Sequence, residues 1–306
     1  MSLTHRLDPA LRHLTEARTV LSTDTLQAVR DSLNHRRRDS ARAFDITGVE
    51  IVDSDEGPVP VRIYRAGPAP APAVIYCHSG AFVLGNLDVD HRQCVELAKH
   101  AQCTVISVDY RLAPEHPFPA ALDDATSALQ WAADNARRLD IDANRIAVVG
   151  NSAGGALAAR LAQRSVDGSV PPIAIALLHQ PVLDDRPTLS KEEFDCTPGF
   201  DGPAVALMWQ HYLGDESAPV DAAPARATEL AGVPTTLITC SDLDPLRDEA
   251  IDYAMRLMIA GVPTGLHVFP GTCHGFDSFL PDWDVSRQLF ALQGAALRRA
   301  FTLPTG

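Results

Sequence analysis

The chain has 306 residues, of which 46% are hydrophobic and 21% are charged, and its formal net charge is -13 at pH 7. This composition indicates a soluble globular protein whose length allows one large domain or two ordinary ones. The excess of negative charge repels polyanions, so nucleic acid and anionic membrane surfaces are poor candidates for partners.

No stretch approaches 18 consecutive apolar residues, and the first residues lack the apolar run of a signal peptide. We therefore expect a cytoplasmic protein without a membrane segment. The six cysteines are scattered through apolar surroundings, which predicts reduced, buried thiols and no disulfide framework. The basic cluster at 35–38 lies among acidic residues, so we expect it on a solvated helix face.

In chain order, residues 8–40 are expected to form two helices, the first capped by Asp8 with Pro9 in its first turn. Apolar, β-branched runs then predict eight strands, at 48–54, 59–65, 73–78, 103–110, 145–150, 173–180, 235–240 and 265–270. The first two strands suit a hairpin. Helical patterns separate the later ones, near 88–100, 120–138, 152–165, 246–260 and 282–301. The predicted fold class is α/β, with a mostly parallel sheet covered on both faces.

Two segments do not fit the alternation of strands and helices. Residues 1–45 precede the sheet, and residues 184–230 interrupt its sixth and seventh strands. We expect these segments to form a lid, and residues 46–183 with 231–306 to form the sheet domain. Since ligands of such sheets bind at the carboxyl ends of the strands, the residues that follow each strand are the candidates for chemistry.

A match to G-x-S-x-G follows the fifth predicted strand, as Gly150-Asn151-Ser152-Ala153-Gly154. Small residues at these positions let a strand and a helix pass close together at a nucleophile elbow, with Ser152 exposed on the turn. The pattern alone is also compatible with a glycine-rich corner that has no catalytic role. A phosphate loop is disfavoured, because neither of its glycine-rich patterns is present.

A serine nucleophile needs a histidine base and a carboxylate that orients the histidine. His274 follows the eighth predicted strand, and Asp242, Asp244 and Asp248 follow the seventh. The order serine, aspartate, histidine is that of the α/β-hydrolases. We favour Asp244, because Pro245 constrains the loop beside it, and expect Asp248 to favour the N-terminal turn of the next helix.

Acyl transfer also requires N–H donors for the oxyanion. The N–H of Ala153, directly after the candidate nucleophile, is one expected donor. The others are expected from the glycine-containing loop after the third strand, which runs from Cys77 to Phe82 and begins with His78.

From about residue 60 to residue 290 the chain resembles the hormone-sensitive-lipase-like carboxylesterases, the bacterial family IV esterases of the α/β-hydrolase fold. The resemblance rests on HSGAFVLGNLDVDH (78–91), DYRLAPEHPFPAALDD (109–124), GNSAGG (150–155), DPLRDE (244–249) and HGF (274–276). It implies a catalytic triad of Ser152, Asp244 and His274. It also implies oxyanion donors at Gly80, Ala81 and Ala153, and a helical cap built from residues 1–45 and 184–230.

The chain departs from the family pattern in two places. The usual HGGG loop reads His78-Ser79-Gly80-Ala81, so Ser79 places a Cβ where the loop can require a positive φ, and we expect its shape to differ there. Asn151 replaces the usual aspartate before the serine, which removes a charge and is expected to tune the site. His78 is expected to orient the loop and to have no direct catalytic role.

These features predict a serine carboxylesterase that hydrolyses short- to medium-chain esters through an acyl-enzyme, without a metal or organic cofactor. Its partner is a small-molecule ester, and a homodimer is possible. The acidic surface weakly favours neutral esters over anionic ones. Cys94, His100 and Cys103 lack a fourth ligand at zinc spacing, so no metal site is expected.

Aromatic residues are the candidates for an apolar substrate pocket, namely Phe82, Trp209 and Phe276, with Phe200 and Tyr212 beside them in the pattern. The helical spacing of MWQHYL predicts a buried aromatic face equally well. An amidase, lactonase, thioesterase or acyltransferase with the same triad remains an alternative. A small-ligand receptor, similar to the plant gibberellin receptors, is disfavoured because all three triad candidates are present.

Overall fold

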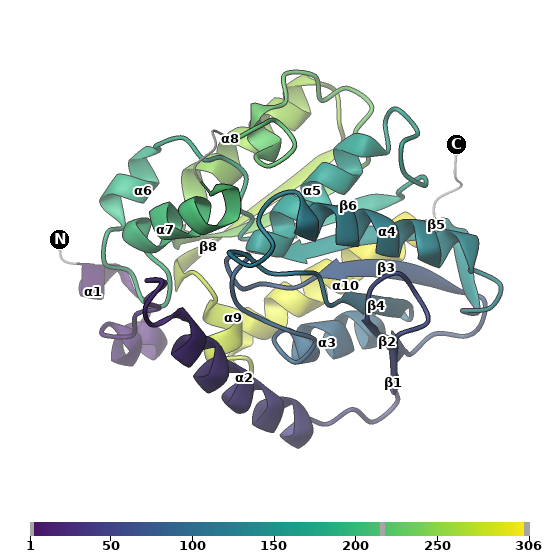
Figure 1. Ribbon diagram of the computed structural model, residues 1–306, viewed down its shortest axis with the longest axis horizontal. Coiled ribbons are helices and arrows are strands. Elements are labelled where there is room, and N and C mark those ends of the chain that lie inside the picture. Colours follow the sequence, from purple (N-terminus) through teal and green to yellow (C-terminus); the bar gives the residue numbers. More distant parts are fainter. Residues whose placement is uncertain (1–2, 215–217, 303–306) are drawn as a thin grey trace.

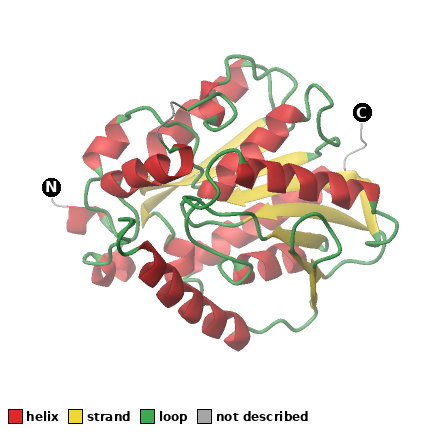
Figure 2. Ribbon diagram, viewed as in Figure 1, coloured by secondary structure: helices red, strands yellow, loops and turns green. Residues whose placement is uncertain are grey.

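The computed structural model describes residues 3–214 and 218–302. Within them, eight strands form one sheet in the order β1-β2-β4-β3-β5-β6-β7-β8 (Figures 1 and 2). Only β1–β2 and β2–β4 pair antiparallel, and the later neighbours pair parallel, as predicted. The strands are β1 (Glu50–Ser54), β2 (Val61–Arg65), β3 (Ala71–Cys77), β4 (Thr104–Val108), β5 (Ile141–Asn151), β6 (Ile175–His179), β7 (Thr236–Leu243) and β8 (Thr264–Cys273).

Helices flank the sheet on both sides (Figure 2). Those of the sheet domain are α3 (His91–Ala101), α4 (Ala120–Asp134), α5 (Ala153–Arg164), α8 (Arg247–Ile259), α9 (Phe276–Phe279) and α10 (Asp284–Thr302). The two remaining segments hold α1 (Leu3–Arg6), the 3₁₀ turn η1 (Pro9–Leu14), α2 (Leu26–Ala43), α6 (Leu189–Glu193), α7 (Gly202–Leu213) and the 3₁₀ turn η2 (Pro224–Arg226). Among the described residues, no helix has the length and apolar character needed to span a bilayer.

The central strands are buried on both faces, and alternate side chains enter two different cores. In β3, Val74 and Tyr76 pack with residues of α3 and α10, whereas Ala73, Ile75 and Cys77 pack with residues of α4 and α5. This double burial explains why the strand sequence is apolar throughout.

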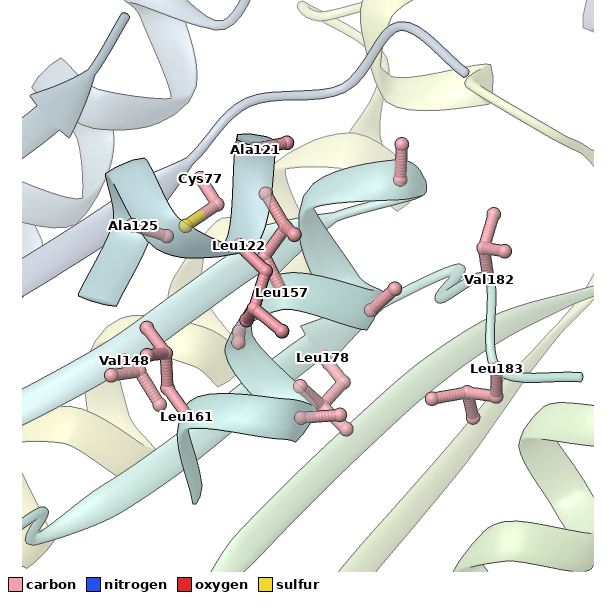
Figure 3. Packing of buried hydrophobic residues seen from close by; sticks show 14 of the residues in the cluster. Cys77, Ala121, Leu122, Ala125, Val148, Leu157, Leu161, Leu178, Val182 and Leu183 are labelled. Atoms are coloured by element: carbon pink, nitrogen blue, oxygen red, sulfur yellow. The ribbon is translucent and has the colours of Figure 1, made fainter. Parts of the chain in front are cut away.

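The core between the sheet and the α4–α5 side is packed around Leu157 and Leu161 of α5. Figure 3 shows these side chains beside residues of α4 and of the strands, which include Leu122, Val148 and Leu178. This packing holds the start of α5 against the ends of β3 and β5, where the residue after β5 is Ser152.

The N-terminal segment differs from the prediction of two helices over 8–40. Asp8 does cap η1, since its carboxylate accepts from the N–H of Ala10 at 2.9 Å, but η1 is a short 3₁₀ turn and residues 15–25 are not helical. The backbone there pairs with a distant segment: Gly199 donates its N–H to the carbonyl of Ala17 at 3.0 Å, and Arg18 forms a bridge with Gly199. Long-range pairing therefore replaces the expected first helix.

Helix α2 lies over the loops that follow β3 and β4 (Figure 1). Arg30 donates to the carbonyl oxygens of Val83 and Ala113, both at 2.6 Å, and forms an ion pair with Glu115. Because β3 and β4 are parallel, these loops leave the same edge of the sheet. Helix α2 therefore covers the carboxyl edge at which ligands are expected.

Helix α6 is anchored to the loop that follows β7. The Ser190 hydroxyl donates to the carbonyl of Pro245 at 2.8 Å, and its backbone N–H donates to the carboxylate of Asp248 at 2.8 Å. A buried ion pair of 2.6 Å joins Lys191 to Glu249 of α8. The segment 184–230 is thus attached beside Asp244, the candidate triad carboxylate.

Candidate active site

Ser152 lies at a sharp turn between β5 and α5. Its backbone has φ 55° and ψ -116°, a left-handed conformation that is strained for a residue with a Cβ. Close approach of the neighbouring chain enforces the turn, because a Cβ on Gly154 would lie only 1.9 Å from the carbonyl oxygen of Cys77. The elbow geometry expected from G-x-S-x-G is therefore present, with the Ser152 hydroxyl beside a cavity.

A hydrogen-bonded chain links this serine to a buried carboxylate. The Nε2 atom of His274 lies 3.0 Å from the Ser152 Oγ, and its Nδ1 lies 2.8 Å from Oδ2 of Asp244. Asp244 is fully buried, and its other oxygen accepts from the N–H of Leu246 at 2.8 Å. The order of atoms is that of a Ser–His–Asp triad.

The other two candidate aspartates lie elsewhere. Asp248 accepts from the backbone of Ser190 and from the Arg247 guanidinium. Asp242 lies beside the backbone of Gly271 and Thr272, and burial raises the pKa of its carboxyl. The structure therefore brings Asp244 to His274, and not Asp242 or Asp248.

The loop after β3 turns its backbone toward the same cavity. Gly80 has φ 133°, and a Cβ there would lie 2.0 Å from the Leu84 carbonyl oxygen, so this position requires glycine. Ala81 follows with φ 55°. In the part of the chain that the structure describes, the N–H groups of Gly80, Ala81 and Ala153 have no protein acceptor. These residues line the cavity or adjoin Ser152, and their N–H groups are available to a ligand.

The His78 side chain is buried away from the Ser152 hydroxyl. Its ring stacks on Tyr110, with centroids 4.1 Å apart, and its Nδ1–H donates to the carbonyl of Ser79 at 2.7 Å. The Tyr110 hydroxyl donates in turn to the carbonyl of His78 at 2.7 Å. Burial lowers the pKa of His78, which favours the neutral ring. These contacts orient the loop, as the sequence predicted for this residue.

A buried carboxylate that the sequence reasoning did not single out connects the two departures from the family pattern. Asp90 accepts from the backbone N–H of Ser79 at 2.8 Å, from its hydroxyl at 2.9 Å and from the Tyr76 hydroxyl at 3.0 Å. The Asn151 amide donates to it at 3.5 Å. Asp90 is 2% exposed, so these donors take the place of water around the charge.

Ser79 and Asn151 therefore both act as donors to one carboxylate. The loop does not require a positive φ at Ser79, because its positive φ values belong to Gly80, Ala81 and Phe82. Asp90 lies inside the motif at 78–91, but an aspartate directly before a helix is typical of an ordinary N-cap and gives no sign of this role. The unusual Ser79 and Asn151 were the signals in the sequence that a common partner was needed.

The Asp90 arrangement predicts that the usual family residue is harmful here. In Asn151→Asp, a second buried carboxylate would replace the amide donor and lie about 3.5 Å from Asp90, where the two acceptors repel each other. We expect kcat for an ester substrate to fall about tenfold at pH 8, as expected when an oxyanion donor is misplaced.

The double variant Asp90→Asn with Asn151→Asp exchanges the carboxylate and the amide and is the matched control. It should regain most of the lost kcat at pH 8. If the double variant is no better than Asn151→Asp at any pH, or if Asn151→Asp matches the wild type at pH 8, then the two side chains do not act as a pair.

Gln180 holds the histidine loop and was also missed. It is fully buried, has φ 45°, and its Oε1 accepts from the N–H of Gly275 at 2.8 Å. Its amide nitrogen donates to Ser241 and to the carbonyl of Cys273. The bonds fix the backbone on both sides of His274. A glutamine directly after β6 carries no local signal for this role, because its partners are about 60 to 95 residues away.

The cavity beside Ser152 has a volume of about 150 Å³, and its apolar wall includes Phe200, Phe279 and Leu84. Of the aromatic candidates, the structure brings only Phe200 to this wall, where its ring lies 4.9 Å from that of His274. Phe279 was not foreseen, because it follows the HGF motif on a short helix that the sequence did not predict.

The assignment of Phe82, Trp209 and Phe276 to the substrate pocket needs correction, since these side chains belong to the core and do not line the cavity. Phe82 stacks on Tyr212 at 3.7 Å between centroids and lies 6.3 Å from Trp209. Phe276 packs on Phe269 in a separate cluster. Aromatic rings gain more from packing on one another than from a partly solvated wall, which explains their burial.

Comparison with known proteins agrees with this geometry. Residues 74–278 match a family model described as the alpha/beta hydrolase fold. The chain belongs to the α/β-hydrolase family. This α/β-hydrolase is 40% identical to esterase LipI of Mycobacterium tuberculosis over 265 residues, which cover 83% of this chain and 82% of LipI. It is 36% identical to carboxylesterase NlhH of the same species, with coverage of 79% and 78%.

Solved structures give the same result. The crystal structure of esterase LipW from Mycobacterium marinum is 56% identical, covers 98% of each chain and superposes with a TM-score of 0.95. A bacterial heroin esterase is 35% identical, with a TM-score of 0.92 and coverage of 99% of this α/β-hydrolase and 100% of the esterase. The matches confirm the family and the fold predicted from the motifs.

Proposed function

We propose that this α/β-hydrolase is a serine carboxylesterase that hydrolyses small carboxylic esters through an acyl-enzyme intermediate. The observation that carries the proposal is the chain of Ser152, His274 and Asp244, with spacings of 3.0 and 2.8 Å. Beside it lie three backbone N–H groups that have no acceptor among the described residues. The similarity to named esterases and carboxylesterases supports it.

In the acylation step, Ser152 Oγ attacks the ester carbonyl while Nε2 of His274 accepts the hydroxyl proton. Asp244 holds His274 in the tautomer that carries its hydrogen on Nδ1 and stabilises the imidazolium that forms. Because Asp244 is fully buried, its charge acts on the ring with little screening by water. The proton on Nε2 then passes to the leaving alcohol.

The tetrahedral intermediate carries a negative charge on the former carbonyl oxygen. The N–H groups of Gly80, Ala81 and Ala153 act as its donors, and the N-terminus of α5 adds a favourable dipole. Because Ala81 keeps its N–H, replacement of the usual third glycine removes no donor. In the second half of the reaction water attacks the acyl-enzyme with His274 as base, and the acid is released.

Residues 1–45 and 184–230 act as a cap over this site, and residues 46–183 with 231–306 form the catalytic domain. Helix α2, through Arg30, and α6, through Ser190, attach these segments to loops that carry catalytic groups. The catalytic cavity of about 150 Å³ suits short acyl groups.

A covalent probe and a substrate series test the proposal together. A fluorophosphonate should label one residue per chain, Ser152, and abolish hydrolysis of p-nitrophenyl esters in proportion to labelling. Across p-nitrophenyl acetate to decanoate, kcat/KM should be highest from acetate to butyrate. Labelling at another residue, or ester hydrolysis that persists after full labelling, would overturn the proposal.

A further inference from the structure

A second and larger cavity adjoins the catalytic one beneath α2. It has a volume of about 460 Å³, and seven of its lining residues also line the catalytic cavity, among them Thr19, Arg37 and Phe279. The two cavities therefore form one groove that leads from Ser152 along the inner side of α2. The proposed mechanism uses only the first part of this groove.

The larger cavity is lined by more positive than negative groups. Four arginines face it, together with two aspartates and His91, and most of these charges are already paired. Two of the arginines have carboxylate partners, since Arg18 lies 3.8 Å from Asp201 and Arg92 lies 2.8 Å from Asp282. Both aspartates are paired as well: Asp88 with Arg62 and Arg38, and Asp277 with His179. Among the residues that the structure describes, Arg36 and Arg37 have no carboxylate partner within 4.0 Å, which leaves a local positive charge.

Arg37 is the cation that lies between the two cavities. Its side chain is half-buried and lines both, and its Nη1 donates to the carbonyl of Val89 at 2.6 Å. Its remaining N–H groups have no acceptor within the described residues. The expectation that the whole basic cluster 35–38 lies on a solvated helix face is therefore wrong for Arg37.

The cavity wall holds a second donor without an acceptor. His91 is 7% exposed, its Nδ1 lies 3.1 Å from the Tyr64 hydroxyl, and its buried Nε2 has no partner within the described residues. Burial raises the pKa of Tyr64 and lowers that of His91, so both groups are neutral. The Tyr64 hydroxyl has no other acceptor among the described residues, so it donates to Nδ1 of His91. The hydrogen of His91 then lies on Nε2, a buried donor of a residue that lines the groove.

Unpaired donors beside a cation are the complement of an anion with several acceptor oxygens, and a carboxylate fits a guanidinium in two-point geometry. We propose that this groove binds a carboxylate of the substrate, so that the enzyme prefers esters that carry a carboxylate group a few carbon atoms from the scissile ester. This inference rests on the proposed esterase function. Arg37 is its specificity-determining residue, and local charge outweighs the net charge of -13 that weakly favoured neutral esters.

Monomethyl and dimethyl esters of glutarate, adipate and pimelate test the inference, with hydrolysis followed by pH-stat titration. For at least one chain length, the wild type should favour the monoester over the diester in kcat/KM by about tenfold or more. In Arg37→Gln, which keeps a donor for Val89 but loses the charge, this ratio should fall about tenfold, and Arg37→Lys should retain part of it. High salt should lower the ratio in the wild type.

Arg42→Gln is the matched control, because it removes a charge from the exposed end of the same helix and should keep the wild-type ratio. The carboxylate site is contradicted if diesters are hydrolysed in a Ser152-dependent way but no monoester is preferred, or if the ratio is unchanged in Arg37→Gln. In either case the esterase function is still supported. If Ser152-dependent hydrolysis of every ester is absent, the proposed function fails and the inference fails with it.

Discussion

Ser152→Ala should lower kcat/KM for p-nitrophenyl acetate by about 10⁴- to 10⁶-fold. The variant loses the nucleophile that His274 activates at 3.0 Å, so no acyl-enzyme can form. The residual rate would come only from a water molecule that uses His274 and the unpaired N–H groups. Steady-state hydrolysis at high enzyme concentration measures the loss, and the initial burst of p-nitrophenol should also disappear.

The control for this experiment is Ser127→Ala, which removes an exposed hydroxyl on α4 and should keep wild-type activity. Urea unfolding separates loss of chemistry from loss of structure. Ser152→Ala should be at least as stable as the wild type, because alanine avoids the cost of burying a hydroxyl group. A folded Ser152→Ala protein with more than a hundredth of wild-type activity would remove Ser152 from the mechanism.

Asp244→Asn should lower kcat by about 10⁴-fold, with a small effect on KM. An asparagine keeps the volume of the side chain but cannot stabilise an imidazolium, and its amide N–H₂ group can donate to Nδ1 of His274. The ring would then hold its hydrogen on Nε2, where it faces Ser152 and cannot accept the serine proton. Single-turnover kinetics with p-nitrophenyl acetate should show that acylation slows, and deacylation should slow as well, because His274 is the base in both steps.

Asp242→Asn and Asp248→Asn serve as matched controls, because both lie in the same loop region but neither reaches His274. Each should lower kcat by less than about tenfold. For Asp248→Asn the expected effect is a loss of stability, through its bond to the Ser190 backbone. A loss for either control as large as that for Asp244→Asn would contradict the assignment of the triad carboxylate.

The regular part of the fold could be predicted because its cause is local in the sequence. Alternating burial makes β3 apolar at every position, since Val74 and Ile75 face different cores, and the helices between the strands carry their own periodicity. The glycines around Ser152 are needed because two backbone segments approach each other closely there. This need for glycine can be recognised from the local sequence.

Other features could not be predicted, because their cause is a contact between distant residues. Residues 15–25 do not form the predicted helix, because the backbone of Ala17 is hydrogen-bonded to Gly199. Phe82 does not line the pocket, because its ring stacks on that of Tyr212, which is 130 positions away in the chain. Helices α6 and α9 lie in segments whose packing partners come from elsewhere in the chain. The helical spacing of MWQHYL, in contrast, did indicate the buried aromatic face of α7.

The sequence by itself determined the eight strands and the helices between the later ones, the elbow at Ser152 and the presence of His274 and an aspartate after later strands. These follow from periodicity, from glycine sterics and from the rule that parallel strands end at one edge. Only the tertiary structure decided which aspartate reaches His274, and that Asp90 receives Ser79 and Asn151. It also decided that the side chain of Arg37 lines a groove and is not fully exposed to solvent. Such choices depend on distances between residues far apart in the chain, which no local pattern encodes.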